Sequence, residues 1–252
     1  MRLSVLAAAA ALALAAPAGA QERTLAFHGY AYDLESGKFL YTEVHRQNVT
    51  GEHWLGGTIE YYAPDGSRIG RKTLDFSQDP YVPVYQLDLT AGSGYMEGIK
   101  SVTADSIEMQ VLGHGSTKVR SASVKRQGTI VADSGFHSFL RDRFPDLLAG
   151  KAVEFKFAVS GKLDVFKFRA RRIEDATFEG QPAVQLRVEP ATWLRFLVDP
   201  LVVLYEPSQR KLLEYRGVSN LHDPRTFEPY NVRIIYPSKR PDDAPPLPEG
   251  TS

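Results

Sequence analysis

The sequence predicts a mainly β, single-domain protein: a curved antiparallel sheet of about a dozen strands, forming a half-open barrel, with one amphipathic helix packed across it. Three observations predict this fold. Apolar and polar residues alternate along most of the chain, as they do in strands with one buried face. Short turn segments separate these runs, and such short links join antiparallel neighbours, because a parallel crossover needs a dozen or more residues. One segment has a strong helical period, and the concave face of a curved sheet can hold a helix.

The strands follow one another along the chain. Val153, Phe155 and Phe157 alternate with polar residues, which is the two-residue period of a half-buried strand. Turn-forming segments such as residues 64–67 (PDGS) lie between neighbouring runs. Further strands are expected at about 24–33, 38–47, 53–63, 67–76, 83–90, 106–112, 117–125, 163–172, 184–188, 201–206, 211–219 and 229–236.

A helix is expected from Ser134 to Ala149. Pro145 ends or kinks its first part, and Gly150 ends the second. Asp133 or Ser134 can cap the first turn. The apolar residues form a continuous stripe that must be buried, so the helix is expected to lie on the sheet. This stripe consists of Phe136, Phe139, Leu140, Phe144, Leu147 and Leu148.

The two ends of the chain differ from the domain between them. Residues 1–20 are expected to be a Sec-type signal peptide cleaved after Ala20, because Arg2 precedes an apolar stretch and small residues precede the cleavage site. That stretch is shorter than the roughly 20 residues that span a membrane, so no transmembrane segment is expected after cleavage. The expected location is the periplasm or the outside of the cell. Residues 21–236 then form one β-rich domain, and residues 237–252 a proline-rich, disordered tail.

The composition excludes several classes of protein. The 252 residues contain no Cys, which excludes disulfide-stapled folds, thiol enzymes and Cys-ligated zinc sites. Basic and acidic residues number 30 each, so no long-range field attracts nucleic acid. No Walker or dinucleotide-binding glycine pattern is present in the sequence, and no cofactor is expected.

Three short segments resemble those of uncharacterised exported proteobacterial proteins: residues 41–46 (YTEVHR), 72–76 (KTLDF) and 94–98 (GYMEG). No activity comes with this resemblance. The expected order of elements also resembles the periplasmic lipoprotein carriers and lipoprotein receptors, in which a curved antiparallel sheet and helices enclose an apolar pocket for acyl chains. That resemblance of architecture implies a lipid or another apolar small molecule as the ligand.

Aromatic residues of the strands and apolar residues of the helix are candidates to line such a pocket, although the same residues also suit a filled sheet core. The apolar segment between Pro190 and Pro200 is either a lid or a core-filling crossover. The candidate ligand-binding residues are Tyr30, Tyr32, Tyr41, Phe136, Phe139, Leu140 and Trp193.

A basic run suggests a second kind of contact. Lys167, Arg169 and Arg171 share one face of a predicted strand whose other face carries Phe168 and Ala170. These cations could contact anionic headgroups or an acidic partner, and the alternative is a solvated face balanced by neighbouring acids.

No catalytic or metal-binding residue is predicted. His28 and His45 lie in neighbouring expected strands, and Glu43 shares a face with His45, so an acid/base pair is conceivable; no His-x-His spacing supports a metal site. The run from Asp133 to His137 contains the residue types of a serine hydrolase, but helix capping explains the same residues.

The sequence therefore predicts a non-enzymatic periplasmic binding or carrier protein for an apolar or acyl-chain ligand. Two alternatives stay open. One is an envelope hydrolase that uses carboxylates or the two strand histidines. The other is an envelope interaction scaffold that uses the segment between Pro190 and Pro200 or the proline-rich tail as its contact.

Overall fold

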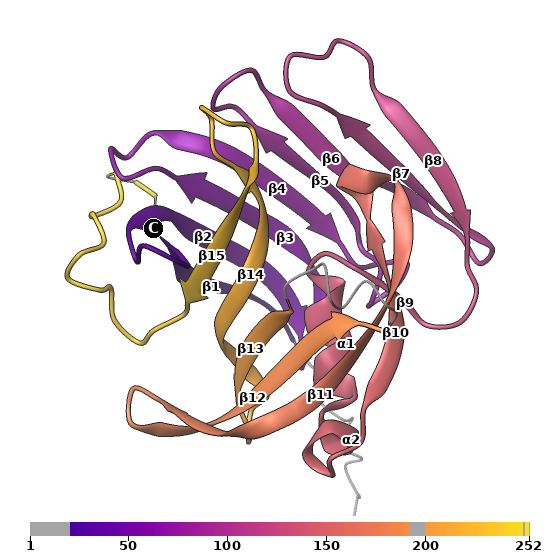
Figure 1. Ribbon diagram of the computed structural model, residues 1–252, viewed down its shortest axis with the longest axis vertical. Helices are drawn as coiled ribbons and strands as arrows, with labels where there is room; N and C mark the ends of the chain where they lie inside the picture. Colours follow the sequence, from indigo (N-terminus) through magenta and orange to yellow (C-terminus); the bar gives the residue numbers. More distant parts are fainter. Residues whose placement is uncertain (1–20, 192–199, 249, 252) are drawn as a thin grey trace, which may run out of the picture.

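The computed structural model describes residues 21–191, 200–248 and 250–251. Fifteen strands form one curved sheet in the order β8-β7-β6-β5-β4-β3-β2-β1-β15-β14-β13-β12-β11-β10-β9 (Figure 1). The first eight are β1 (Glu22–Asp33), β2 (Phe39–Thr50), β3 (His53–Tyr62), β4 (Arg68–Asp75), β5 (Val84–Leu89), β6 (Tyr95–Val102), β7 (Ser106–Leu112) and β8 (Arg120–Lys125). The others are β9 (Ile130–Ala132), β10 (Val153–Val159), β11 (Asp164–Phe178), β12 (Gln181–Pro190), β13 (Leu201–Glu206), β14 (Lys211–His222) and β15 (Pro229–Ile235).

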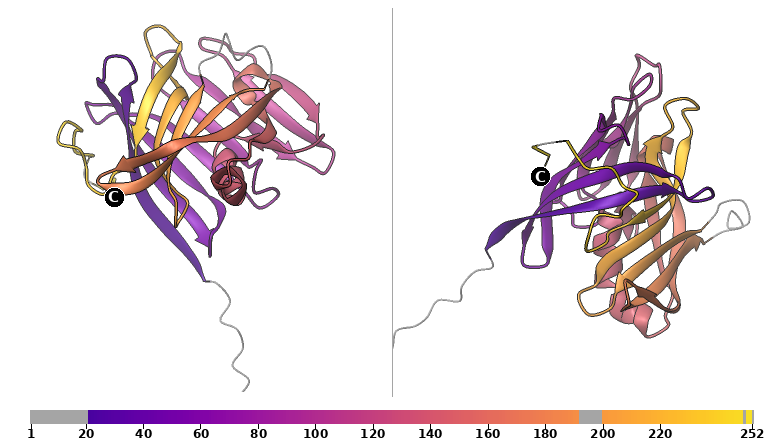
Figure 2. Two further views of the ribbon diagram at one scale, coloured as in Figure 1. Left: turned by 60° about the horizontal axis from the view of Figure 1, so that its bottom comes forward. Right: turned by 90° about the vertical axis from the view of Figure 1, so that its left-hand side faces the viewer.

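The sheet consists of two meanders joined by its first and last strands. In the described sheet, β1 to β8 pair in sequence order, as do β9 to β15, and β1 pairs with β15. All these pairs are antiparallel except β9 with β10. The sheet curls so that β10 to β13 lie across from β3 to β6, with the helices between them (Figures 1 and 2). The expected half-open barrel is thus confirmed.

The pairing between β1 and β15 is short. It covers only Tyr30 to Asp33 of β1, whereas the pairing of β1 with β2 begins at Glu22. In the described sheet, the first part of β1 therefore has no strand partner on its β15 side. We call this stretch, where no ladder joins β1 to its neighbour in the wall, the lateral break; residues 236–240 and Lys211 lie beside it.

The helix lies on the concave face, as the sequence predicts. It has two parts, α1 (Gly135–Asp142) and α2 (Phe144–Leu148), because Pro145 starts a new turn, and Gly150 follows with a positive φ of 79°. The start of α1 fits tightly, since a Cβ on Gly135 would lie 2.1 Å from the carbonyl oxygen of Tyr81. The capping interpretation is wrong, because no side-chain hydrogen bond caps α1.

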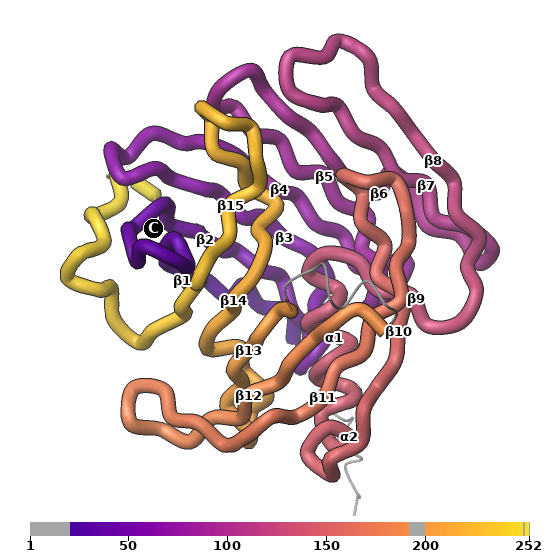
Figure 3. The backbone as a smooth tube through the Cα atoms, in the orientation of Figure 1, coloured from indigo at the N-terminus to yellow at the C-terminus, as the bar shows by residue number. Residues whose placement is uncertain are grey.

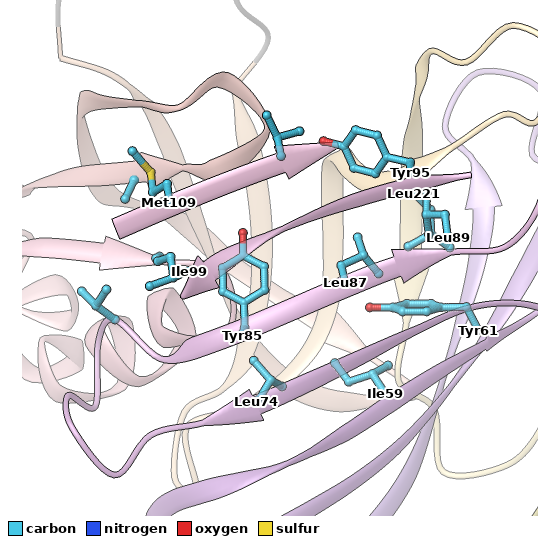
Figure 4. Close-up of a cluster of buried hydrophobic side chains, with 14 of the residues drawn as sticks. Ile59, Tyr61, Leu74, Tyr85, Leu87, Leu89, Tyr95, Ile99, Met109 and Leu221 are labelled. Carbon is cyan, nitrogen blue, oxygen red and sulfur yellow. The ribbon is translucent and has the colours of Figure 1, made fainter. Parts of the chain in front are cut away.

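Two apolar cores lie inside the sheet. One is built on β3 to β7 with parts of β14 and β15, and Figure 4 shows its side chains projecting from the same face of neighbouring strands. The other packs α1 and α2 against β10 to β13; in it, the rings of Phe139 and Phe155 are tilted by 55° with their centroids 5.1 Å apart. The two helices thus cover the part of the concave face formed by β10 to β13. The part of the sheet around β1 lies next to them.

Two strands are absent from the sequence prediction. In β6, Gly98 and a register irregularity between Ile99 and Ser101 break the alternation, so buried residues occur in succession. In β9, only three residues pair, and they do so parallel to β10. Neither strand carries the two-residue period by which the others are predicted.

The C-terminal segment, for which the sequence predicts a disordered tail, has contacts with the sheet. Residues 237–248 contain no helix or strand, yet they pack beside β1 and β2, where Figure 3 shows the segment in yellow. Ala244 is buried against Tyr30 and Tyr32, and the Tyr32 hydroxyl donates to Asp243 Oδ1 at 2.9 Å. The prolines prevent regular secondary structure in this segment, but the segment packs on the apolar surface of these two tyrosines. None of the helices described is long and apolar enough to cross a membrane.

Candidate functional site

A cavity of about 760 Å³ lies between the concave face and α1. This volume falls within the range of pockets that bind small molecules, roughly 300–1,000 Å³. Its wall combines apolar side chains with nearly as many polar and charged ones, and these come from β1 to β4, α1, β10, β13 to β15 and the turn before β14. The apolar part of the lining includes Leu25, Phe27, Trp54, Ile59, Phe136, Phe157, Leu201, Leu212, Leu221 and Ile234.

A buried ion pair forms part of the inner wall. Lys72 Nζ of β4 lies 2.5 Å from Oδ2 of Asp133, and their side chains are only 7% and 3% exposed. Asp133 precedes α1 with a positive φ of 43°, which an aspartate tolerates better than most residues, and its Oδ1 accepts from the Ser134 N–H at 2.6 Å. The backbone turn thus aims one oxygen at the helix start and the other at Lys72.

A buried carboxyl group lies behind this ion pair. Glu97 of β6 accepts hydrogen bonds from Tyr95 at 2.8 Å and from the Asn220 amide at 2.5 Å. Burial raises the pKa of Glu97, so the neutral acid is favoured more than in water. The short helix η1 (Ser160–Lys162) covers the cluster, and a Cβ on Gly161 would lie 2.6 Å from Glu97 Oε2. A larger residue at position 161 would therefore have to displace the Glu97 carboxylate and the Tyr95 hydroxyl, which lie at this contact between the two meanders.

A second polar group lines the cavity on β2. Glu43 Oε2 lies 2.9 Å from Nε2 of His45 and accepts a hydrogen bond from the Tyr236 hydroxyl at 3.0 Å. Phe27 stacks on the His45 ring with centroids 4.3 Å apart. Burial raises the pKa of Tyr236 well above its usual range, so its hydroxyl keeps the proton that it donates. Gly29 makes the arrangement possible, because a Cβ there would lie 2.8 Å from Glu43 Oε2.

A histidine and a tyrosine connect α1 to the sheet across the cavity. His137 Nδ1 and the Tyr205 hydroxyl are 2.8 Å apart, and the His137 ring lies 5.1 Å from that of Trp54. Burial, followed by the charge of Arg141, lowers the pKa of His137 to about 3, so the imidazole is neutral at pH 7. The helix is therefore held between β3 and β13 by neutral contacts.

The mouth of the cavity is basic. The mouth is the part of the lining that reaches solvent, and its charged residues are Arg23, Arg141, Arg210, Lys211 and one acid, Glu52. Arg141 donates to the backbone oxygen of Glu52 at 3.0 Å, and Arg210 donates to the backbone oxygen of Arg141 at 3.4 Å. These bonds bring together the turn after β2, the last turn of α1 and the turn before β14. Arg23, in the first part of β1, and Lys211 also lie beside the lateral break.

The helix residues predicted to bind a ligand lie at or near this cavity. Phe136 borders it, whereas Phe139 and Leu140 are buried in the core beneath the helix. Tyr41 is fully buried behind the wall, with its hydroxyl 2.9 Å from Ser219 Oγ. Trp193 lies outside the described residues, as do most of the segment between the two prolines and residues 1–20.

The other predicted site residues lie elsewhere. Tyr30 and Tyr32 lie under the C-terminal segment and do not border the main cavity. Arg169 and Arg171 both approach Glu189, with nitrogen–oxygen distances of 2.7 and 3.7 Å. Lys167, on the same strand β11, is exposed. Arg187 also lies 3.3 Å from Glu189, so one carboxylate faces three arginines and the basic run keeps an excess of positive charge.

The pair of strand histidines does not form. In the register of β1 and β2, His45 lies opposite Phe27, whereas His28 lies opposite Val44, so the two rings occupy opposite faces of the sheet. The expected pairing of His45 with Glu43 is present. No cluster of three or more metal-ligating side chains occurs among the described residues.

The run before and within α1 does not form a hydrolase triad. The Ser134 hydroxyl donates to Asp133 at 2.7 Å, while His137 is engaged with Tyr205. A nucleophile–base pair needs serine and histidine within hydrogen-bond reach of each other, and neither of these bonds provides it.

The charged groups of the wall were missed by sequence reasoning. Lys72 and Asp133 are 61 positions apart, and Glu97 and Asn220 are 123 apart. A lysine in an otherwise apolar-facing position of its strand is the one local signal, because the alternation places Lys72 on the buried face with Leu74.

Comparisons with known proteins identify no family or function. No protein-family model matches the chain, and no curated protein matches it. Among solved structures, the chain is similar to a β-barrel-like protein of the domain of unknown function DUF1849 from Brucella abortus. The two are 9% identical, the match covers 84% of this chain and 95% of the other, and the TM-score is 0.47.

Proposed function

We propose that this chain is an exported binding or carrier protein that holds a small amphipathic molecule in the cavity between the sheet and α1. The observation that carries the proposal is the cavity of about 760 Å³, with a largely apolar wall and a few buried polar groups. Such a composition is typical of small-molecule sites, where apolar contact supplies affinity and a few polar groups fix the orientation.

The polar groups of the wall favour binding over catalysis. Lys72 is paired with Asp133, and Glu43 with His45 and Tyr236. Lys72, Asp133 and Glu43 thus have partners within the protein, whereas the buried Nδ1 of His45 has no hydrogen-bond partner among the described residues. A ligand in the cavity therefore makes its contacts mainly with the apolar side chains of the wall.

Native mass spectrometry of the protein purified from the cells that make it tests this proposal. We expect a bound small molecule, released on unfolding, and binding of a fluorescent apolar probe to the ligand-free protein. A ligand-free spectrum together with no probe binding contradicts the proposal.

A matched pair of variants locates the site. Leu25→Trp places a larger side chain at a position that borders the cavity, whereas Leu55→Trp makes the same change at an exposed position that does not. We expect Leu25→Trp to weaken probe binding at least about tenfold through steric blockage, and Leu55→Trp to leave it unchanged. Circular dichroism shows that both variants are folded, and equal probe affinities place the binding elsewhere.

A further inference from the structure

We propose that the ligand is an anionic amphiphile whose alkyl chain lies in the cavity and whose carboxylate or phosphate group lies at the mouth, against Arg23, Arg210 and Lys211. This inference rests on the proposed function and adds the chemical class and the orientation of the ligand. It is carried by the distribution of charge along the cavity.

The mouth has an excess of cations. Arg141 lies 3.4 Å from the Glu52 carboxylate and is partly neutralised by it. Arg23, Arg210 and Lys211 form no ion pair within the described part of the chain, although they border the same opening. Arginine and lysine side chains at a solvent-exposed opening bind an anionic group while it stays partly hydrated.

The inner end repels an anion. The buried side chains of Glu43 and Asp133 border the cavity there. The one lysine, Lys72, is already bonded to Asp133. An anionic group placed at this end would lose its hydration and face carboxylates, which is unfavourable on both counts. The orientation with the anion at the mouth follows.

The lateral break is the place where the alkyl chain of the ligand enters the cavity. The first part of β1 has no partner on its β15 side, and Leu25 and Phe27 of this stretch border the cavity. Arg23 lies on the same face, two residues before Leu25. An alkyl chain that passes this edge therefore contacts Leu25 and Phe27 while its anionic group reaches Arg23.

Isothermal titration calorimetry with four twelve-carbon probes tests the inference: dodecanoate, dodecyl phosphate, dodecan-1-ol and dodecylammonium, each below its micelle concentration. We expect one or both anions to bind at least about tenfold more tightly than the alcohol and the amine. Affinity for the preferred anion should rise about fourfold per added methylene, which corresponds to about 0.8 kcal/mol per buried CH₂. Preference for only one of the two anions supports the inference and identifies the headgroup.

The double variant Arg23→Glu/Lys211→Glu removes two of the cations. We expect it to lose the preference for the anions over dodecan-1-ol. The double variant Arg71→Glu/Lys118→Glu changes the net charge equally at exposed positions that do not border the cavity, and it should keep the preference. Circular dichroism shows that both variants are folded.

The outcomes separate this inference from the proposed function. If none of the four probes binds, the proposed function fails. If the alcohol or the amine binds as tightly as the anions, or if both double variants reduce anion binding equally, the proposed function stands and the anionic ligand is wrong.

Discussion

Lys72 and Asp133 form an ion pair whose two members depend on each other. Both side chains are almost entirely buried, and their charges compensate each other at 2.5 Å. Removal of one partner leaves an uncompensated charge in the interior, whereas removal of both leaves neutral groups. The pair is therefore a sensitive probe of how the wall of the cavity is built.

We expect Lys72→Met to lower the free energy of unfolding by about 3–5 kcal/mol, because it leaves the buried Asp133 carboxylate without its cation. The double variant Lys72→Met/Asp133→Asn should recover most of this loss, since asparagine also tolerates a positive φ. Urea titrations followed by circular dichroism measure both values.

The exposed pair of Lys151 and Asp146 provides the control. Their charged atoms are 2.9 Å apart, but the side chains are 68% and 39% exposed. Lys151→Met should cost no more than about 1 kcal/mol, as is usual for pairs at the surface. If Lys72→Met costs no more than this control, the buried pair does not contribute as described.

The role of Asp133 marks the limit of sequence reasoning about single residues. Its position before an apolar stripe indicates a helix cap, and local spacing carries no sign of a lysine 61 positions earlier. The same limit applies to Tyr30 and Tyr32, whose alternation shows that they share a face but not that this face lies under the C-terminal segment.

At the scale of elements, prediction succeeded where a period is regular. The helix was found from its stripe, and its division at Pro145 from the missing N–H of proline. Most strands were found from alternation, whereas β6 and β9 have a bulge or only three residues. The cavity could not be predicted, because the fit between a helix and a curved sheet depends on contacts between distant segments.

The helix contributes to stability through its buried face. Leu140 is fully buried, whereas Leu148 at the end of α2 is 38% exposed. We expect Leu140→Ala to lower the free energy of unfolding by about 2–5 kcal/mol through lost burial and a cavity, and Leu148→Ala by less than about 1 kcal/mol. Urea titrations test this difference, and equal losses would show that α1 is not anchored through its apolar stripe.

At the scale of the whole molecule, buried histidines make stability depend on pH. Burial lowers the pKa of His137 to about 3 and that of His222 to about 4. Both histidines have a pKa of about 6.5 in the unfolded chain. Between about pH 6.5 and 4 the unfolded chain therefore binds more protons than the folded one, so the stability present above pH 6.5 is lost as the pH falls.

We expect the two histidines to lower the free energy of unfolding between pH 7 and pH 4, each by at most about 1.4 kcal/mol per pH unit, while the raised pKa of Glu97 acts in the opposite direction. His137→Gln should reduce the slope of the free energy of unfolding against pH. The reduction corresponds to at most one bound proton, because glutamine does not titrate. Urea titrations at pH 4, 5, 6 and 7 measure the slope. His53→Gln, at an exposed position, should leave the slope unchanged, and an unchanged slope in His137→Gln contradicts the assignment.

The pairing of β1 with β15 couples the order of the chain to the order of folding. Every other pair of neighbouring strands in the described sheet is consecutive in sequence, so each can form soon after its two strands meet. The pairing of β1 with β15 can form only after the last strand is in place. It is slow because the chain between the two strands loses conformational entropy before their contacts form. Both meanders contribute to the cavity wall, so a molecule held there can act only on this final step. It would slow unfolding of the protein and leave the rates of the early hairpins unchanged.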